Sequence, residues 1–81
     1  MFGYERRKKI IAVDFDGCLC ADAWPEIGEE NKDALNELRK EKLLGTRIIL
    51  WTCRSGRKLQ EAIDWCKERG ITFDEINANL M

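Results

Sequence analysis

The segment that decides the fold is Ile10-Ile11-Ala12-Val13-Asp14-Phe15-Asp16-Gly17, in which an apolar run leads into two carboxylates and a glycine. Such a run is typical of a strand buried on both faces, as in a parallel sheet covered by helices. Open α/β sheets bind their ligands at the carboxyl ends of such strands. Because Asp14 and Asp16 alternate with Phe15, the pleat should direct both carboxylates to one side. The segment therefore predicts a catalytic or metal site at the end of the first strand.

The rest of the chain alternates between strand-like and helix-like patterns. We expect strands at residues 9–14, 47–52 and 71–76, helices at residues 29–44 and from 56 or 57 to Gly70, and a loop at residues 17–28. Ser55 is the candidate N-cap of the second helix. Short connections favour right-handed crossovers and a parallel sheet. The predicted fold class is α/β, a three-layer Rossmann-like half-unit with the strand order 3-2-1.

Composition narrows the class of protein. The 81 residues predict one domain, and the net charge of -1 argues against a general nucleic-acid or membrane surface. The sequence has no secretory signal and no apolar run near the ~20 residues of a membrane span. Its 4 cysteines form no C-x-x-C pair and it has no histidine, which argues against a zinc site. We therefore expect a cytoplasmic protein with reduced thiols.

A second polar segment follows the second expected strand and reads Thr52-Cys53-Arg54-Ser55-Gly56. If the first two strands are neighbours, this segment lies beside Asp14 and Asp16. A turn into a helix N-terminus presents free N–H groups that bind phosphate oxygens. Carboxylates that hold Mg²⁺ beside such a turn suggest phosphoryl chemistry.

Together these residues resemble the haloacid dehalogenase superfamily of aspartate-nucleophile phosphohydrolases. Its first motif is a hydrophobic strand ending in Asp-x-Asp-Gly-Thr, and this chain reads Asp14-Phe15-Asp16-Gly17-Cys18. Its second motif is a strand ending in Ser or Thr, matched here by Ile48-Ile49-Leu50-Trp51-Thr52. The resemblance covers about residues 9–77 and is greatest to small capless members. It implies that residues 1–81 form one truncated domain of this type.

The resemblance also implies roles for individual residues. Asp14 would attack phosphorus and form an aspartyl-phosphate, and Asp16 would act as general acid and base. Mg²⁺ would be held by the Asp14 carboxylate and the Asp16 backbone carbonyl. Thr52 Oγ1 and the Cys53 N–H would hold the transferring phosphoryl group. Arg54 would bind a substrate phosphate or carboxylate, with a structural ion pair as the equally weighted alternative.

The sequence also departs from the family pattern. Cys18 replaces the usual threonine, and no basic residue or acidic pair follows the third expected strand. The first strand would then be a bare apolar edge. Three explanations stay open: a short form that forms a homodimer through this edge, a truncated product, or completion of the site by a partner chain.

The predicted function is a Mg²⁺-dependent phosphatase that acts through Asp14 on a small phosphorylated substrate. The main alternative is a catalytically incomplete fragment, or a non-enzymatic binding or oligomerisation module, that keeps the phosphate pocket. A receiver-like phospho-acceptor domain is a third and weaker option, since it also expects a lysine on a later strand. For Trp24, an aromatic that caps the core is favoured over a lid that faces the substrate.

Overall fold

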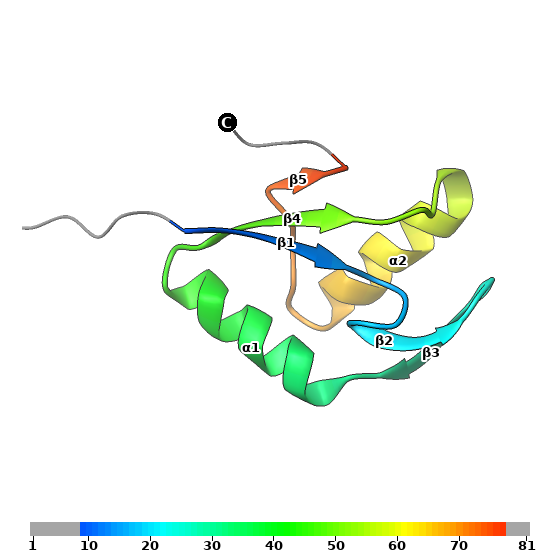
Figure 1. Cartoon of the computed structure of the whole chain (residues 1–81), viewed down its shortest axis with the longest axis horizontal. Coiled ribbons are helices and arrows are strands. Elements are labelled where there is room, and N and C mark those ends of the chain that lie inside the picture. The colour runs from blue at the N-terminus through cyan, green and yellow to red at the C-terminus, as the bar shows by residue number, and fades with distance from the viewer. Residues whose placement is uncertain (1–8, 78–81) are drawn as a thin grey trace, which may run out of the picture.

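The computed structural model describes residues 9–77 (Figure 1). Along the chain it has β1 (Ile10–Asp14), β2 (Cys20–Ala23), β3 (Glu26–Glu30), α1 (Lys32–Leu43), β4 (Arg47–Trp51), α2 (Gly56–Glu68) and β5 (Glu75–Ile76). The main sheet is parallel and has the order β1-β4-β5, which confirms the predicted order 3-2-1. Asp14 pairs with Trp51, so the carboxyl ends of β1 and β4 lie side by side.

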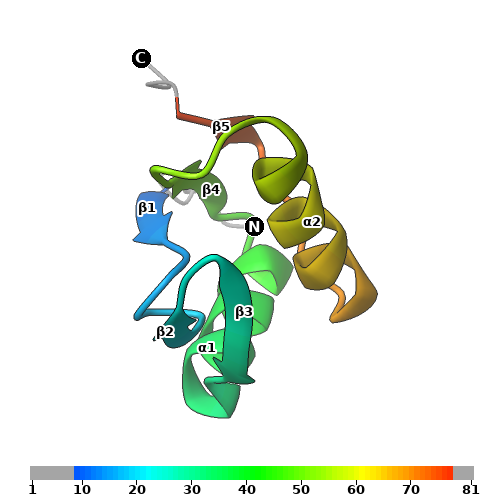
Figure 2. The same cartoon turned by 90° about the vertical axis from the view of Figure 1, so that its right-hand side faces the viewer.

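The two helices cover the same face of this sheet, which gives two layers and corrects the three-layer prediction (Figure 2). The physical reason is the strand order. Both crossovers step in the same direction, from β1 to β4 and from β4 to β5, and right-handed crossovers then put both helices on one face.

The core lies between this covered face and the two helices. Ile48 and Leu50 of β4 are fully buried there, and Val13 of β1 packs against the same cluster. Its other buried members come from the segment after β1, the two helices and the α2–β5 connection: Phe15, Leu19, Cys20, Leu35, Leu38, Ala62, Cys66 and Ile71.

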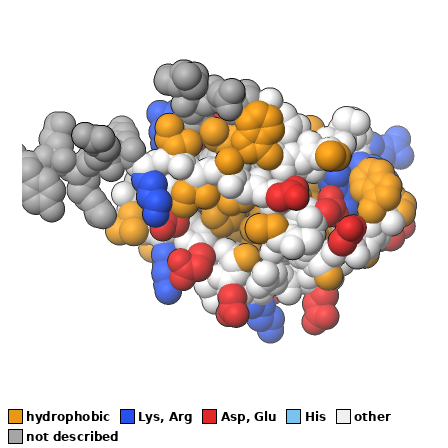
Figure 3. Space-filling model, in the orientation of Figure 1, with side chains coloured by type: hydrophobic (Ala, Val, Ile, Leu, Met, Phe, Trp, Pro, Cys, Tyr) orange, Lys and Arg blue, Asp and Glu red, His pale blue; other side chains and the backbone are white. Residues whose placement is uncertain are grey.

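The opposite face of β1 and β4 carries exposed apolar side chains (Figure 3). Ile10 is 49% exposed and Trp51 is 39% exposed. The expectation that β1 is buried on both faces is therefore wrong, whereas Ile48, Ile49 and Leu50 of β4 are all buried. As expected, β1 forms an edge of the sheet, with β4 as its neighbour. The expected pairing of this edge with a second copy stays a prediction.

The predicted loop at residues 17–28 is instead an antiparallel hairpin of β2 and β3 with Trp24 and Pro25 at its tip. Gly28 lets β3 approach β2 closely, since a Cβ there would collide with the carbonyl of Ala21. The pairing of β2 with β3 is irregular between Cys20 and Asp22, and Ala21, which lies within this irregularity, is the residue that Gly28 approaches. The hairpin lies next to the end of β1 and therefore borders the candidate site.

Two further element boundaries differ from the sequence predictions. The first helix begins at Lys32, because Asn31 is its N-cap and Asn31 Oδ1 accepts a hydrogen bond from the Ala34 N–H at 3.2 Å. The third strand is only Glu75–Ile76. Ser55 does occupy the N-cap position of α2, but its side chain makes no capping hydrogen bond. Within residues 9–77, none of the helices has the length and apolar character needed to cross a membrane.

Candidate functional site

Asp14 lies at the carboxyl end of β1 with an exposed carboxylate. One of its oxygens, Oδ1, accepts a hydrogen bond from the Phe15 N–H at 2.8 Å. Next to it is a hollow of about 480 Å³, lined by Ala12, Val13, Asp14, Trp51, Thr52 and Cys53. Asp14 and two of the three expected phosphate-binding residues thus line one depression.

Two hydrogen bonds fix Thr52, one to the residue after β5 and one within the turn after β4. Its N–H donates to Asn77 Oδ1 at 2.8 Å, and its Oγ1 accepts the Arg54 N–H at 3.1 Å. Cys53 is exposed, and within residues 9–77 no hydrogen bond engages its N–H. The turn after β4 is therefore held in place and leaves the Cys53 N–H available to an anion.

Asp16 lies in a different environment, because Arg54 holds its carboxylate on both oxygens. Arg54 Nε donates to Asp16 Oδ2 at 2.8 Å, and Arg54 Nη2 donates to Asp16 Oδ1 at 2.7 Å. This is the two-bond geometry in which arginine binds a carboxylate most strongly. The hydrogen bond to Asp16 also raises the pKa of Arg54, so its guanidinium stays charged.

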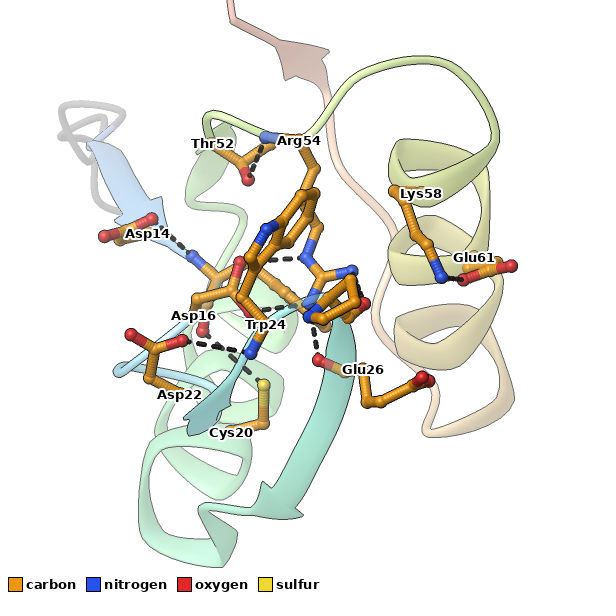
Figure 4. A network of polar contacts seen from close by, with 12 residues as sticks. Asp14, Asp16, Cys20, Asp22, Trp24, Glu26, Thr52, Arg54, Lys58 and Glu61 are labelled. Atoms are coloured by element: carbon orange, nitrogen blue, oxygen red, sulfur yellow. Dashed lines mark hydrogen bonds and ion pairs between the residues drawn. The ribbon is translucent and has the colours of Figure 1, made fainter.

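Arg54 is almost fully buried, with 2% of its surface exposed. Its guanidinium lies between two rings, 5.1 Å from the centroid of Phe15 and 5.0 Å from the centroid of Trp24. It also donates to the carbonyl oxygens of Pro25 at 3.4 Å and Glu26 at 2.9 Å (Figure 4). This geometry matches the structural ion pair, the alternative that the sequence left open for Arg54.

The two carboxylates of the Asp-x-Asp motif line different hollows, contrary to the expectation from the pleat. Asp14 borders the hollow with Thr52, whereas Asp16 borders a second one of about 290 Å³ with Asp22, Trp24, Cys53 and Arg54. The regular strand ends at Asp14, and Asp16 belongs to an isolated bridge with Cys20. Strand alternation therefore does not extend to Asp16. Cys53 borders both hollows and connects them.

The side chains that could bind a metal decide whether this site suits Mg²⁺. The part of the chain that the structure describes has no group of three or more acidic, cysteine or histidine side chains placed to hold a metal. Both oxygens of Asp16 already bind Arg54, which leaves the exposed carboxylate of Asp14 as the side-chain ligand. Mg²⁺ commonly binds through one or two carboxylates while keeping several waters, so the residues fit a lightly held ion.

Sequence reasoning missed three features of the site. The Asn77 side chain binds Thr52 although the two residues are far apart in the chain. The hairpin carbonyls bind Arg54, and nothing in the sequence signals this contact. Trp24 lies on Arg54, a contact that the aromatic and basic residue types permit but do not locate.

Among solved structures, the chain is similar to a conserved protein from Bacteroides thetaiotaomicron. The two chains share 42% sequence identity and superpose with a TM-score of 0.83. The match covers 88% of this chain and 59% of the other, so this chain spans about three fifths of that protein's length. No protein-family model and no curated protein matches the chain.

Proposed function

We propose that this chain is a Mg²⁺-dependent phosphohydrolase of the haloacid dehalogenase type, with Asp14 as its nucleophile. The observation that supports this most directly is the hollow at the ends of β1 and β4. It brings Asp14, Thr52 and Cys53 together at the carboxyl edge of a parallel sheet. Ligands bind at this edge in open α/β folds, and the Asp-x-Asp-Gly sequence supplies the chemistry.

In the first half of the reaction, an Asp14 carboxylate oxygen attacks phosphorus. An Asp14–phosphorus bond forms, the bond from phosphorus to the substrate oxygen breaks, and the leaving oxygen takes a proton. Thr52 Oγ1 and the Cys53 N–H bind the phosphoryl oxygens during this transfer. Because Asp14 Oδ1 already accepts a hydrogen bond from the Phe15 N–H, Oδ2 would be the attacking atom.

In the second half, water attacks the aspartyl-phosphate, inorganic phosphate leaves, and Asp14 is regenerated. Asp16 would give the proton in the first half and take one from water in the second. Because Arg54 binds both of its oxygens, Asp16 must release at least one hydrogen bond to act in this way. Mg²⁺, when bound at Asp14, would neutralise charge on the transferring phosphoryl group.

The alternative function is a catalytically incomplete module that keeps the phosphate-binding hollow. Two observations favour it. Arg54 binds both oxygens of Asp16, the proposed acid, and among residues 9–77 neither a lysine nor a second acidic residue lines the hollow beside Asp14. Such a module would bind phosphate without turning over a phosphate ester.

Hydrolysis of an aryl phosphate with and without Mg²⁺ separates the two functions. We expect metal-dependent turnover by the wild-type chain and a loss of about 10³-fold or more in Asp14→Asn. Asp64→Asn is the matched control, because Asp64 is an exposed carboxylate on α2 outside both hollows. Thermal unfolding should show that both variants stay folded.

Each outcome of this experiment has a definite reading. Turnover that survives in Asp14→Asn would exclude Asp14 as nucleophile. A wild-type chain that binds inorganic phosphate but hydrolyses nothing would support the incomplete module. Mass spectrometry of the quenched reaction should find one added phosphoryl group on the wild-type chain and none on Asp14→Asn.

A further inference from the structure

Trp24 is 58% exposed at the tip of the hairpin, although its ring contacts the buried Arg54. One face of its indole ring lies on the Arg54 guanidinium, whose carbon is 5.0 Å from the ring centroid. A tryptophan that only caps the core would bury most of its ring. Here the contact with Arg54 holds the ring and leaves much of its surface open to a ligand.

The position of the ring is fixed before any ligand binds. Arg54 donates to the carbonyl oxygens of Pro25 at the tip and of Glu26 at the start of β3, and the Trp24 N–H donates to Asp22 Oδ1 at 3.3 Å. Because these bonds hold the backbone on both sides of the indole, little conformational freedom is lost when a ligand stacks on it.

The hollow beside Trp24 has the size and chemistry for a flat ring. Its volume of about 290 Å³ is at the lower end of the range for small-molecule sites, which is roughly 300–1,000 Å³. It therefore suits one ring system better than a large ligand. The exposed Asp22 carboxylate at its border can accept hydrogen bonds from ring N–H groups.

This hollow adjoins the one that contains Asp14. Cys53 borders both, so a phosphate ester could place its phosphoryl group at Asp14 and its organic part at Trp24. In Figure 4, Trp24 lies against Arg54 near Asp16, whereas Asp14 lies apart from them at the tip of β1. The phosphoryl group of such a substrate would lie at this tip, and its organic part would lie beside Trp24.

We infer that the substrates are phosphate monoesters that carry a flat aromatic ring, and that Trp24 is the residue that selects them by stacking. This inference rests on the proposed function for the position of the phosphoryl group. Stacking of a base on an aromatic side chain changes affinity about 5- to 150-fold. The preference for a ring-bearing substrate should therefore be of this size.

The test compares adenosine 5′-monophosphate with ribose 5-phosphate, which has the same phosphate and sugar but lacks the aromatic base. We expect the wild-type kcat/KM to be about 5- to 150-fold higher for the nucleotide, mainly through KM. In Trp24→Ala this ratio should fall towards one, and Trp24→Phe should restore most of it. Leu43→Ala is the control for loss of an exposed apolar side chain, since Leu43 is 88% exposed on α1.

Failure of this inference can be told apart from failure of the proposed function. Equal kcat/KM for both compounds in the wild-type chain would overturn the inference and leave the hydrolase intact. An equal fall for both compounds in Trp24→Ala would do the same, because Trp24 would then only support the hairpin. If neither compound is hydrolysed, the hydrolase fails, and calorimetric titration decides: tighter nucleotide binding that depends on Trp24 supports ring selection, and equal binding overturns it.

Discussion

Replacing Arg54 with methionine should be among the most destabilising single changes in this protein. The substitution keeps the length and apolar stem of the side chain but removes its charge and donors. Arg54 makes two hydrogen bonds to the Asp16 carboxylate, at 2.8 and 2.7 Å, and two to hairpin carbonyls, at 2.9 and 3.4 Å. The variant would leave a partly buried carboxylate without its partner.

The size of the effect follows from these contacts. Removing one partner of a buried ion pair costs about 3–5 kcal/mol, chiefly because the remaining charge is uncompensated. The Asp16 side chain keeps 22% of its surface exposed, so water recovers part of this cost. The expected loss is therefore about 3 kcal/mol. Since a domain of this size has a total stability of about 4–12 kcal/mol, the loss should be easy to measure.

Urea unfolding followed by circular dichroism is the assay, with Lys58→Met as the matched control. Lys58 and Glu61 form an ion pair on α2 at 3.4 Å, with side chains 36% and 45% exposed. Breaking an exposed pair of this kind should cost about 1 kcal/mol or less. Both substitutions remove one positive charge. The difference between their losses in the free energy of unfolding therefore measures the effect of the burial and bonding geometry of Arg54.

The double variant Asp16→Asn, Arg54→Met tests the cause. If the cost comes from the stranded carboxylate, the double variant should be more stable than the sum of the two single losses predicts, by about 1–3 kcal/mol. The reasoning is refuted if Arg54→Met is no more destabilising than Lys58→Met, or if the two losses simply add. Arg54→Lys, which keeps the charge but not the two-bond geometry, should lie between wild type and Arg54→Met.

Two further predictions concern the core and the hairpin. Burial raises the pKa of Cys66 from its ordinary value of 9.0 to about 12, so only the unfolded chain loses this proton as the pH rises between these values. The free energy of unfolding should then fall by up to about 1.4 kcal/mol per pH unit above pH 9, and Cys66→Ala should lose this part of the slope in urea titrations. Gly28→Ala should cost about 1–3 kcal/mol, because its Cβ would meet the backbone of Ala21, and an unchanged urea midpoint would show that the hairpin yields freely.

The sequence predicted the main sheet well because its signals are local. The run before Asp14 and the run at residues 48–51 both form strands, and the crossover rule gives their order. The same rule also implies two helices on one face, so the three-layer prediction overlooked a consequence of the strand order. The burial of β1 could not be read from its apolar run, because burial depends on what lies beside an edge strand.

The hairpin and the Arg54 cluster were harder to foresee. Residues 20–23 and 26–30 carry charges and a glycine and lack a regular alternation of apolar and polar residues, so propensity favoured a loop. Tertiary contacts decide the outcome instead, since Arg54 binds the carbonyls at the hairpin tip. Arginine residues that bind substrates and arginine residues that bind carboxylates have the same sequence signature, and the structure alone shows which partner is near.

The Asp16–Arg54 pair connects stability with the proposed chemistry. The contacts that hold the hairpin against the end of β1 also occupy the carboxylate that would act as general acid and base. Loosening the pair would free Asp16 but weaken the support of Trp24, since Arg54 also lies against that ring. The proposed reaction would therefore require a small displacement of Arg54 that releases one Asp16 oxygen while the bonds to the hairpin persist. Arg54 has donors for this, because Nη1 binds Pro25 alone and Nη2 is shared between Asp16 and Glu26.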